Sequence, residues 1–69
     1  MATSSHVAEL SSLRTQLEDL RRRVAAMADA YREQPDVTAA TDLFNAERSL
    51  LAAARSVERA ARSLEKNSR

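Results

Sequence analysis

The chain has 69 residues, of which 43% are hydrophobic, and its 11 basic and 10 acidic side chains leave a formal net charge of +1. Domains below about 70–80 residues usually depend on disulfides, a metal or association for stability. The absence of cysteine excludes a disulfide and a thiolate zinc site, and His6 has no second histidine with which to share a metal. We therefore expect one small domain, without a metal or cofactor, that gains stability by association.

The first predicted element is a helix over about residues 5–32, with Thr3, Ser4 and Ser5 placed to cap its first turn. Its apolar residues are separated alternately by three and four positions, which is typical of a helix that packs against another helix. In heptad notation, positions a hold Leu10, Leu17, Val24 and Tyr31, and positions d hold Leu13, Leu20 and Met27.

A turn is predicted over about residues 33–37. It contains Pro35, the only proline, which has no N–H group and disfavours helical geometry at the preceding residue. Asp36 or Thr38 can then cap a second helix, which is predicted over about residues 38–65, and residues 66–69 are predicted to form a frayed tail. The chain thus reads as two helices of similar length joined by a short connection.

The second helix carries an internal repeat of the form Ala-x-Arg-Ser-apolar, which begins at Ala46, Ala53 and Ala60 with Glu47 in place of alanine in the first copy. Large apolar residues occupy its d positions and small ones its a and g positions, which allows a neighbouring helix to approach closely. The d positions are Leu43, Leu50, Val57 and Leu64, the a positions include Ala40, Ala54 and Ala61, and the g positions are Ala39, Ala46, Ala53 and Ala60.

The two halves predict an all-α fold, an antiparallel two-helix coiled-coil hairpin that spans residues 1–69 as a single domain. Folding at Pro35 pairs residues whose numbers sum to about 70, so Leu20 is expected to meet Leu50 in the seam between the helices. On one edge, Arg14 is expected near Glu58 and Arg21 near Leu51.

Phe44 and Leu51 are apolar residues at e positions, beside Ala28 and outside the predicted seam. A lone hairpin would leave them partly in water, and burying a side chain of this size is worth about 1.5–3 kcal/mol. We therefore predict that two hairpins form a homodimeric four-helix bundle. The residues predicted to form the protein interface are Phe44, Leu51, Ala28 and Arg21.

Basic residues give a second candidate surface. The run Arg21-Arg22-Arg23 follows Glu18 and Asp19 at pairing distance, so most of its charge is expected to be neutralised within the helix. Other basic residues repeat along the second helix or gather at its C-terminal end. They would bind an acidic protein partner or a phosphate, or alternatively form an ordinary solvated helix end. These residues are Arg48, Arg55, Arg59, Arg62 and Lys66.

In helix number and length the predicted hairpin resembles the small RNA-binding plasmid copy-number regulators. The spacing of Ser11 with Arg14, and of Ser56 with Arg59, is similar to one fragment of the series by which actinobacterial anti-sigma hairpins bind cyclic di-GMP, whereas the other positions differ. Neither resemblance assigns the chain to a family.

The sequence therefore predicts a non-enzymatic protein-protein interaction module, a self-associating hairpin that acts as adaptor, scaffold or regulatory subunit. The alternative is a regulator associated with nucleic acid or transcription, acting through the basic end or as an anti-sigma-like hairpin. His6 lacks the orienting partner of a catalytic histidine, and no small-molecule substrate is expected. The lack of a membrane span or signal peptide favours a cytoplasmic location without membrane contact, and the Ala- and Arg-rich composition with Lys66 as the only lysine suits a bacterial source.

Overall fold

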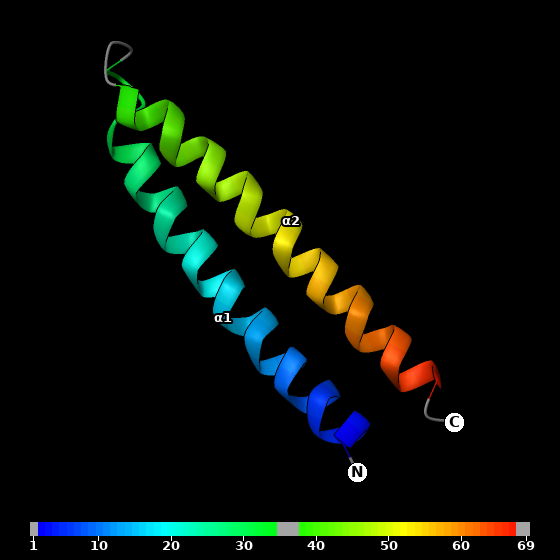
Figure 1. Ribbon diagram of the computed structural model, residues 1–69. Coiled ribbons are helices and arrows are strands. Elements are labelled where there is room, and N and C mark those ends of the chain that lie inside the picture. Colours follow the sequence, from blue (N-terminus) through cyan, green and yellow to red (C-terminus); the bar gives the residue numbers. More distant parts are fainter. Residues whose placement is uncertain (1, 35–37, 68–69) are drawn as a thin grey trace.

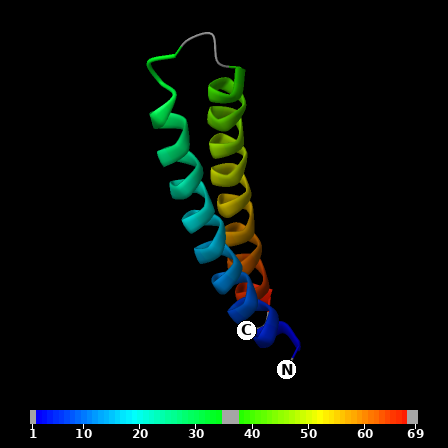
Figure 2. The same cartoon turned by 90° about the vertical axis from the view of Figure 1, so that its left-hand side faces the viewer.

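The computed structural model describes residues 2–34 and 38–67, which form two helices, α1 (Ala2–Ala30) and α2 (Thr38–Asn67). The helices lie side by side and run in opposite directions, with the two chain ends at the same end of the molecule (Figure 1). The view from the side shows the same arrangement (Figure 2). The predicted all-α helical hairpin is therefore confirmed.

The start and end of α1 differ by a few residues from the prediction. Ser4 and Ser5 lie inside the helix, because no glycine or proline interrupts the chain before them. After Ala30 the backbone tightens: the Tyr31 N–H donates to the Ala28 carbonyl at 3.1 Å and the Gln34 N–H to the Tyr31 carbonyl at 3.0 Å. These bonds span three residues rather than four, which is common where a helix ends. The helix therefore ends before residue 32.

The connection and the end of α2 are described in part. Pro35 and Asp36, the predicted helix breaker and cap, lie outside the described residues. Lys66 and Asn67 were predicted to fray, but they belong to α2, while residues 68–69 of the predicted tail lie outside the described part. The Lys66 ammonium in the last turn favours this continuation, because cations interact favourably with the negative end of a helix.

The molecule is a thin rod that measures 52 × 14 × 11 Å. Its radius of gyration is 15.7 Å, against about 11 Å for a compact domain of this length. Among the described residues only two apolar side chains are buried, Ala28 at 0% exposure and Ala54 at 2%, and none of the large side chains is fully buried. The hairpin alone thus builds a core from two methyl groups.

The seam between the helices follows the predicted heptad on α2 but departs from it on α1. Its d residues on α2, from Leu43 to Leu64, are half-buried. On α1 the inner row, defined as Leu10, Leu17 and Val24, is half-buried as well. The outer row, defined as Leu13, Leu20 and Met27, is exposed by 41%, 42% and 52%. The prediction that the outer row packs in the seam, where Leu20 would meet Leu50, is therefore wrong.

The place expected for the outer row is taken by Arg14, Arg21 and Ala28, which follow the inner row at a distance of four residues. Arg14 and Arg21 are half-buried and Ala28 is fully buried. Arg21 crosses the seam, with its Nη1 3.4 Å from Oε2 of Glu47. An arginine can occupy such a position because its methylene stem packs against apolar groups while its guanidinium reaches a carboxylate or water.

Candidate functional site

Because the hairpin is antiparallel, its two open sides have different compositions. The two helices of such a pair are related by an approximate two-fold axis perpendicular to the rod. Residues that follow a seam residue by the same number of positions on either helix therefore lie on the same side of the hairpin. The contact between Arg21 and Glu47 fixes one side, since Arg21 follows the seam residue Leu17 by four positions and Glu47 follows the seam residue Leu43 by four positions. The residues that follow those seam residues by three positions then share the other side.

The uncharged flank is the side that holds the outer row of α1 together with Ala46 and Ala53 of α2. The three outer-row side chains are exposed, whereas both alanines are half-buried. Large apolar side chains of one helix thus lie along a strip of small ones on the other. None of these five residues is charged.

The charged flank is the opposite side, which holds Phe44 and Leu51 of α2 together with an ion-pair cluster. Arg21 is the centre of that cluster: its Nε lies 3.3 Å from Oε2 of Glu18 and its Nη1 3.4 Å from Oε2 of Glu47. The three charged side chains are 24–28% exposed. An ion pair on this side links the two helices while its outer atoms stay in contact with water.

The charged flank continues as a shallow groove toward the chain ends. The groove is lined from α1 by Val7, Leu10 and Arg14 and from α2 by Glu58 and Arg62, among others. Arg14 and Glu58 therefore line one depression, and Glu58 forms an ion pair with Arg62 on its own helix, at 3.0 Å between Arg62 Nη1 and Glu58 Oε1.

The four residues predicted to form a protein interface do not make one accessible patch. Phe44 and Leu51 are half-buried on the charged flank, and Arg21 is engaged by two carboxylates. Ala28 has 0% exposure, because it is enclosed between the helices. It leaves no surface for a partner, so the part of this candidate site that can touch another molecule is Phe44 and Leu51.

The predicted basic contacts lie on the outside of α2 and several engage neighbours on the same helix. Arg48 donates to the Asn45 side chain, and the Arg59 Nη2 donates to the Ser56 hydroxyl at 3.0 Å. The run at residues 21–23 behaves as expected from its charge pattern: Arg22 and Arg23 lie 4.0 and 3.7 Å from the Asp19 carboxylate. The Asp19 carboxylate therefore offsets charge on Arg22 and Arg23, whereas Asn45 and Ser56 are neutral partners that leave the charges of Arg48 and Arg59 in place.

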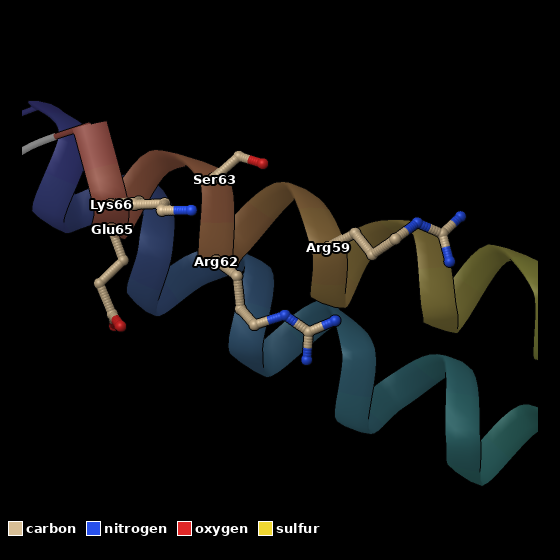
Figure 3. Close-up of a pocket in the computed structure, with 5 residues that line it drawn as sticks. All are labelled: Arg59, Arg62, Ser63, Glu65 and Lys66. Atoms are coloured by element: carbon tan, nitrogen blue, oxygen red, sulfur yellow. The ribbon is translucent and has the colours of Figure 1, made fainter.

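A surface depression lies at the C-terminal end of α2, lined by Arg59, Arg62, Ser63, Glu65 and Lys66. Figure 3 shows that all five side chains come from α2 and extend in different directions rather than toward a common point. A bound phosphate needs several donors that converge on its oxygens. The depression lacks that convergence and also contains a carboxylate.

Other chemistry has little support within residues 2–34 and 38–67. In this part of the chain, no three His, Asp or Glu side chains gather in a group that would hold a metal ion. His6 is exposed on α1. Neither α1 nor α2 has an apolar stretch long enough to cross a membrane.

The exposed outer row is the feature that reasoning from sequence missed. A second ladder with the same spacing runs through Val7, Leu10, Arg14, Leu17, Arg21, Val24 and Ala28, and it is the one that packs in the seam. The sequence signal for this ladder is the spacing of Arg14 and Arg21, which are seven residues apart. Glu47 on the other helix can pair with one of them, and it does pair with Arg21.

Comparison of the chain with models of known protein families, with curated proteins and with solved structures found no match.

Proposed function

We propose that this protein is a non-enzymatic, cytoplasmic interaction module, a helical hairpin that self-associates into a homodimeric four-helix bundle and serves as an adaptor, scaffold or regulatory subunit. In the dimer, a second copy covers apolar side chains that the single hairpin leaves outside its seam. The remaining surface, which includes the basic residues of α2, then faces a protein partner.

The observation that carries the proposal is the thin core. The largest residues of the hairpin are at most half-buried, and Leu13, Leu20, Met27 and Tyr31 are 40–52% exposed. Four exposed large apolar residues are many for a molecule with two buried alanines, because domains this small need burial from some source to offset the loss of chain entropy. Without a cysteine or a described metal cluster, burial against another chain is the available source.

The total surface points the same way. The accessible surface is 5213 Å², about 900 Å² more than the roughly 4,300 Å² expected for a folded monomer of 7.6 kDa. A typical specific interface buries about 800 Å² on each partner. The surplus of one hairpin therefore matches what one dimer interface would remove from water.

The test is the mass of the protein in solution, measured by sedimentation equilibrium from about 0.1 to 100 μM, a range that brackets the micromolar affinity of an ordinary weak dimer. We expect twice the chain mass in the upper part of this range. Thermal unfolding recorded at the same concentrations should shift to higher temperature as the concentration rises, because association stabilises the folded state by mass action.

A folded protein that keeps the mass of one chain throughout, with an unfolding temperature independent of concentration, would contradict the proposal. A mass above that of two chains would retain self-association and replace the four-helix bundle by a larger assembly.

A further inference from the structure

We infer that the second copy docks on the uncharged flank, so that the outer row of each hairpin packs over the alanines Ala46 and Ala53 of the other. This inference rests on the proposed self-association and specifies the surface, which differs from the Phe44 and Leu51 contact predicted from sequence.

The distribution of charge favours docking on the uncharged flank. The buried centres of protein interfaces are depleted in charged residues, because a charge removed from water must be paired and hydrogen-bonded. The uncharged flank meets this condition over both of its rows. Docking on the charged flank would instead remove from water the cluster of Glu18, Arg21 and Glu47, whose side chains are 24–28% exposed.

The large side chains of the outer row are placed to fit against the small ones of Ala46 and Ala53. The level of residues along the rod follows from the contact of Arg21 with Glu47, which places Leu20 at the level of residue 48 on α2. Leu20 therefore lies between the levels of Ala46 and Ala53. Because their side chains are small, a leucine from a facing helix can insert between them as a knob into a hole.

Two-fold symmetry brings these complementary rows of two copies together. A two-fold axis parallel to the rod, between two hairpins placed face to face, brings α1 of each copy over α2 of the other at the same level. The outer row then lies over alanines rather than over a second row of large residues. All neighbouring helices in this bundle run antiparallel, which is the arrangement of up-and-down four-helix bundles.

The size of the surplus surface, as well as its shape, favours a second copy of the chain as the molecule that docks on the uncharged flank. The surplus surface of about 900 Å² per chain is close to the roughly 800 Å² that each partner contributes to a stable interface. A second copy supplies an outer row and an alanine strip of equal length, so one kind of chain satisfies both sides of the contact.

The first experiment places negative charge on the uncharged flank, or at a control position of α1, and measures the dimer dissociation constant by sedimentation. The double variant Leu20→Glu, Met27→Glu is expected to raise this constant by about 100-fold or more, because two carboxylates would enter a dry interface. The matched control Ala26→Glu adds a carboxylate to an exposed position between these two residues and is expected to change the constant by less than about twofold.

The second experiment does not depend on whether a charged variant folds. Since the chain has no cysteine, Leu20→Cys and Leu51→Cys each create a single thiol, whose rate of alkylation by iodoacetamide reports its exposure. Leu20 is exposed in the single hairpin and Leu51 is half-buried, so the Leu20→Cys thiol reacts faster when the protein is dilute. Docking on the uncharged flank inverts this order at concentrations where the dimer forms.

The outcomes separate this inference from the proposed function. A wild-type protein that is a monomer at every concentration would overturn both. A dimer in which the Leu20→Cys thiol stays the more reactive, or which survives Leu20→Glu with Met27→Glu and is lost with Phe44→Glu, would overturn the inference and leave the proposed self-association standing.

Discussion

The two helices contribute unequally to the seam that joins them. α2 presents the rows that its heptad repeat predicts, with half-buried residues from Leu43 to Leu64 and with Ala54 buried among them. α1 turns its inner row and Ala28 into the seam and leaves the outer row exposed. Beside its seam, α2 thus adds only the half-buried Phe44 and Leu51 as large apolar residues, whereas α1 has a whole exposed row that its one neighbour does not cover.

This difference indicates that the width of an apolar stripe, and not only its period, reports how many neighbours a helix packs against. A helix with one packing neighbour needs two seam rows, and a helix in a bundle contacts two neighbours and needs a wider stripe. The stripe of α1 is wide, because the outer row and the ladder with Arg14 and Arg21 are both present. The extra row is the part of the fold that the hairpin by itself does not use.

The largest expected effect tests where the seam lies on α1. Ala28→Leu should destabilise the protein by about 1–3 kcal/mol, because extra methylene groups at a position with 0% exposure force the helices apart. Urea unfolding followed by circular dichroism measures this change.

The control for this prediction is Ala26→Leu, which makes the same substitution two residues away at an exposed position and should change stability by less than about 0.5 kcal/mol. Equal effects at the two positions would place the centre of the seam somewhere other than Ala28.

A smaller effect is expected for the ion pair that replaces apolar packing in α1. A double-mutant cycle of Arg21→Ala and Glu47→Ala should give a coupling energy of roughly 0.5–1 kcal/mol, reduced at high salt. The comparison pair is Arg32 and Asp29, in which Arg32 Nη2 lies only 2.7 Å from Asp29 Oδ1. Their side chains are 67% and 62% exposed, so water and ions screen them and the coupling should stay below about 0.3 kcal/mol.

If the shorter, exposed pair proved to be the stronger one, burial would not be the property that gives the Arg21 contact its value. Unfolding in urea at low and high sodium chloride concentrations, with all four members of each cycle, distinguishes these results.

The smallest effect is expected at the basic end of α2. Replacing Arg59 and Lys66 by glutamine should leave the mass of the protein in solution unchanged, because both residues are exposed on the outside of the rod. We also expect no retention of a mixed DNA and RNA pool at about 150 mM salt, where a few unclustered charges bind phosphate weakly. Binding that weakens steeply with salt and is lost in this variant would instead favour the predicted alternative of a nucleic-acid regulator.

Much of the fold follows from the sequence because period and chain breaks are local properties. The lengths of the helices, their antiparallel pairing and the seam of α2 were predictable from apolar spacing, the lack of glycine and the position of Pro35. The seam of α1 was not, because two ladders with identical spacing compete there. The one that packs contains two arginines, and the contact of Arg21 with Glu47, which lies 26 residues further along the chain, is not visible in a local pattern.

The candidate site was predictable to a lesser extent. Apolar excess was located at Phe44 and Leu51, and both lie at the edge of the seam, half-buried. The larger set of exposed apolar residues, the outer row of α1, was not predicted, because these leucines and this methionine had been assigned to the core. Whether a residue lies in a seam or beside it depends on a rotation of the helix by about half the angle between neighbouring residues, and periodicity does not fix that rotation.

The start of α1 and the end of α2 lie at the same end of the rod, which is 52 Å long (Figure 1). Any label or protein fused near Ala2 or near Asn67 would consequently extend from the same end of the rod. In a bundle whose symmetry axis runs along the rod, these ends of both copies would lie together, so any proteins fused to them would be held on one side of the assembly.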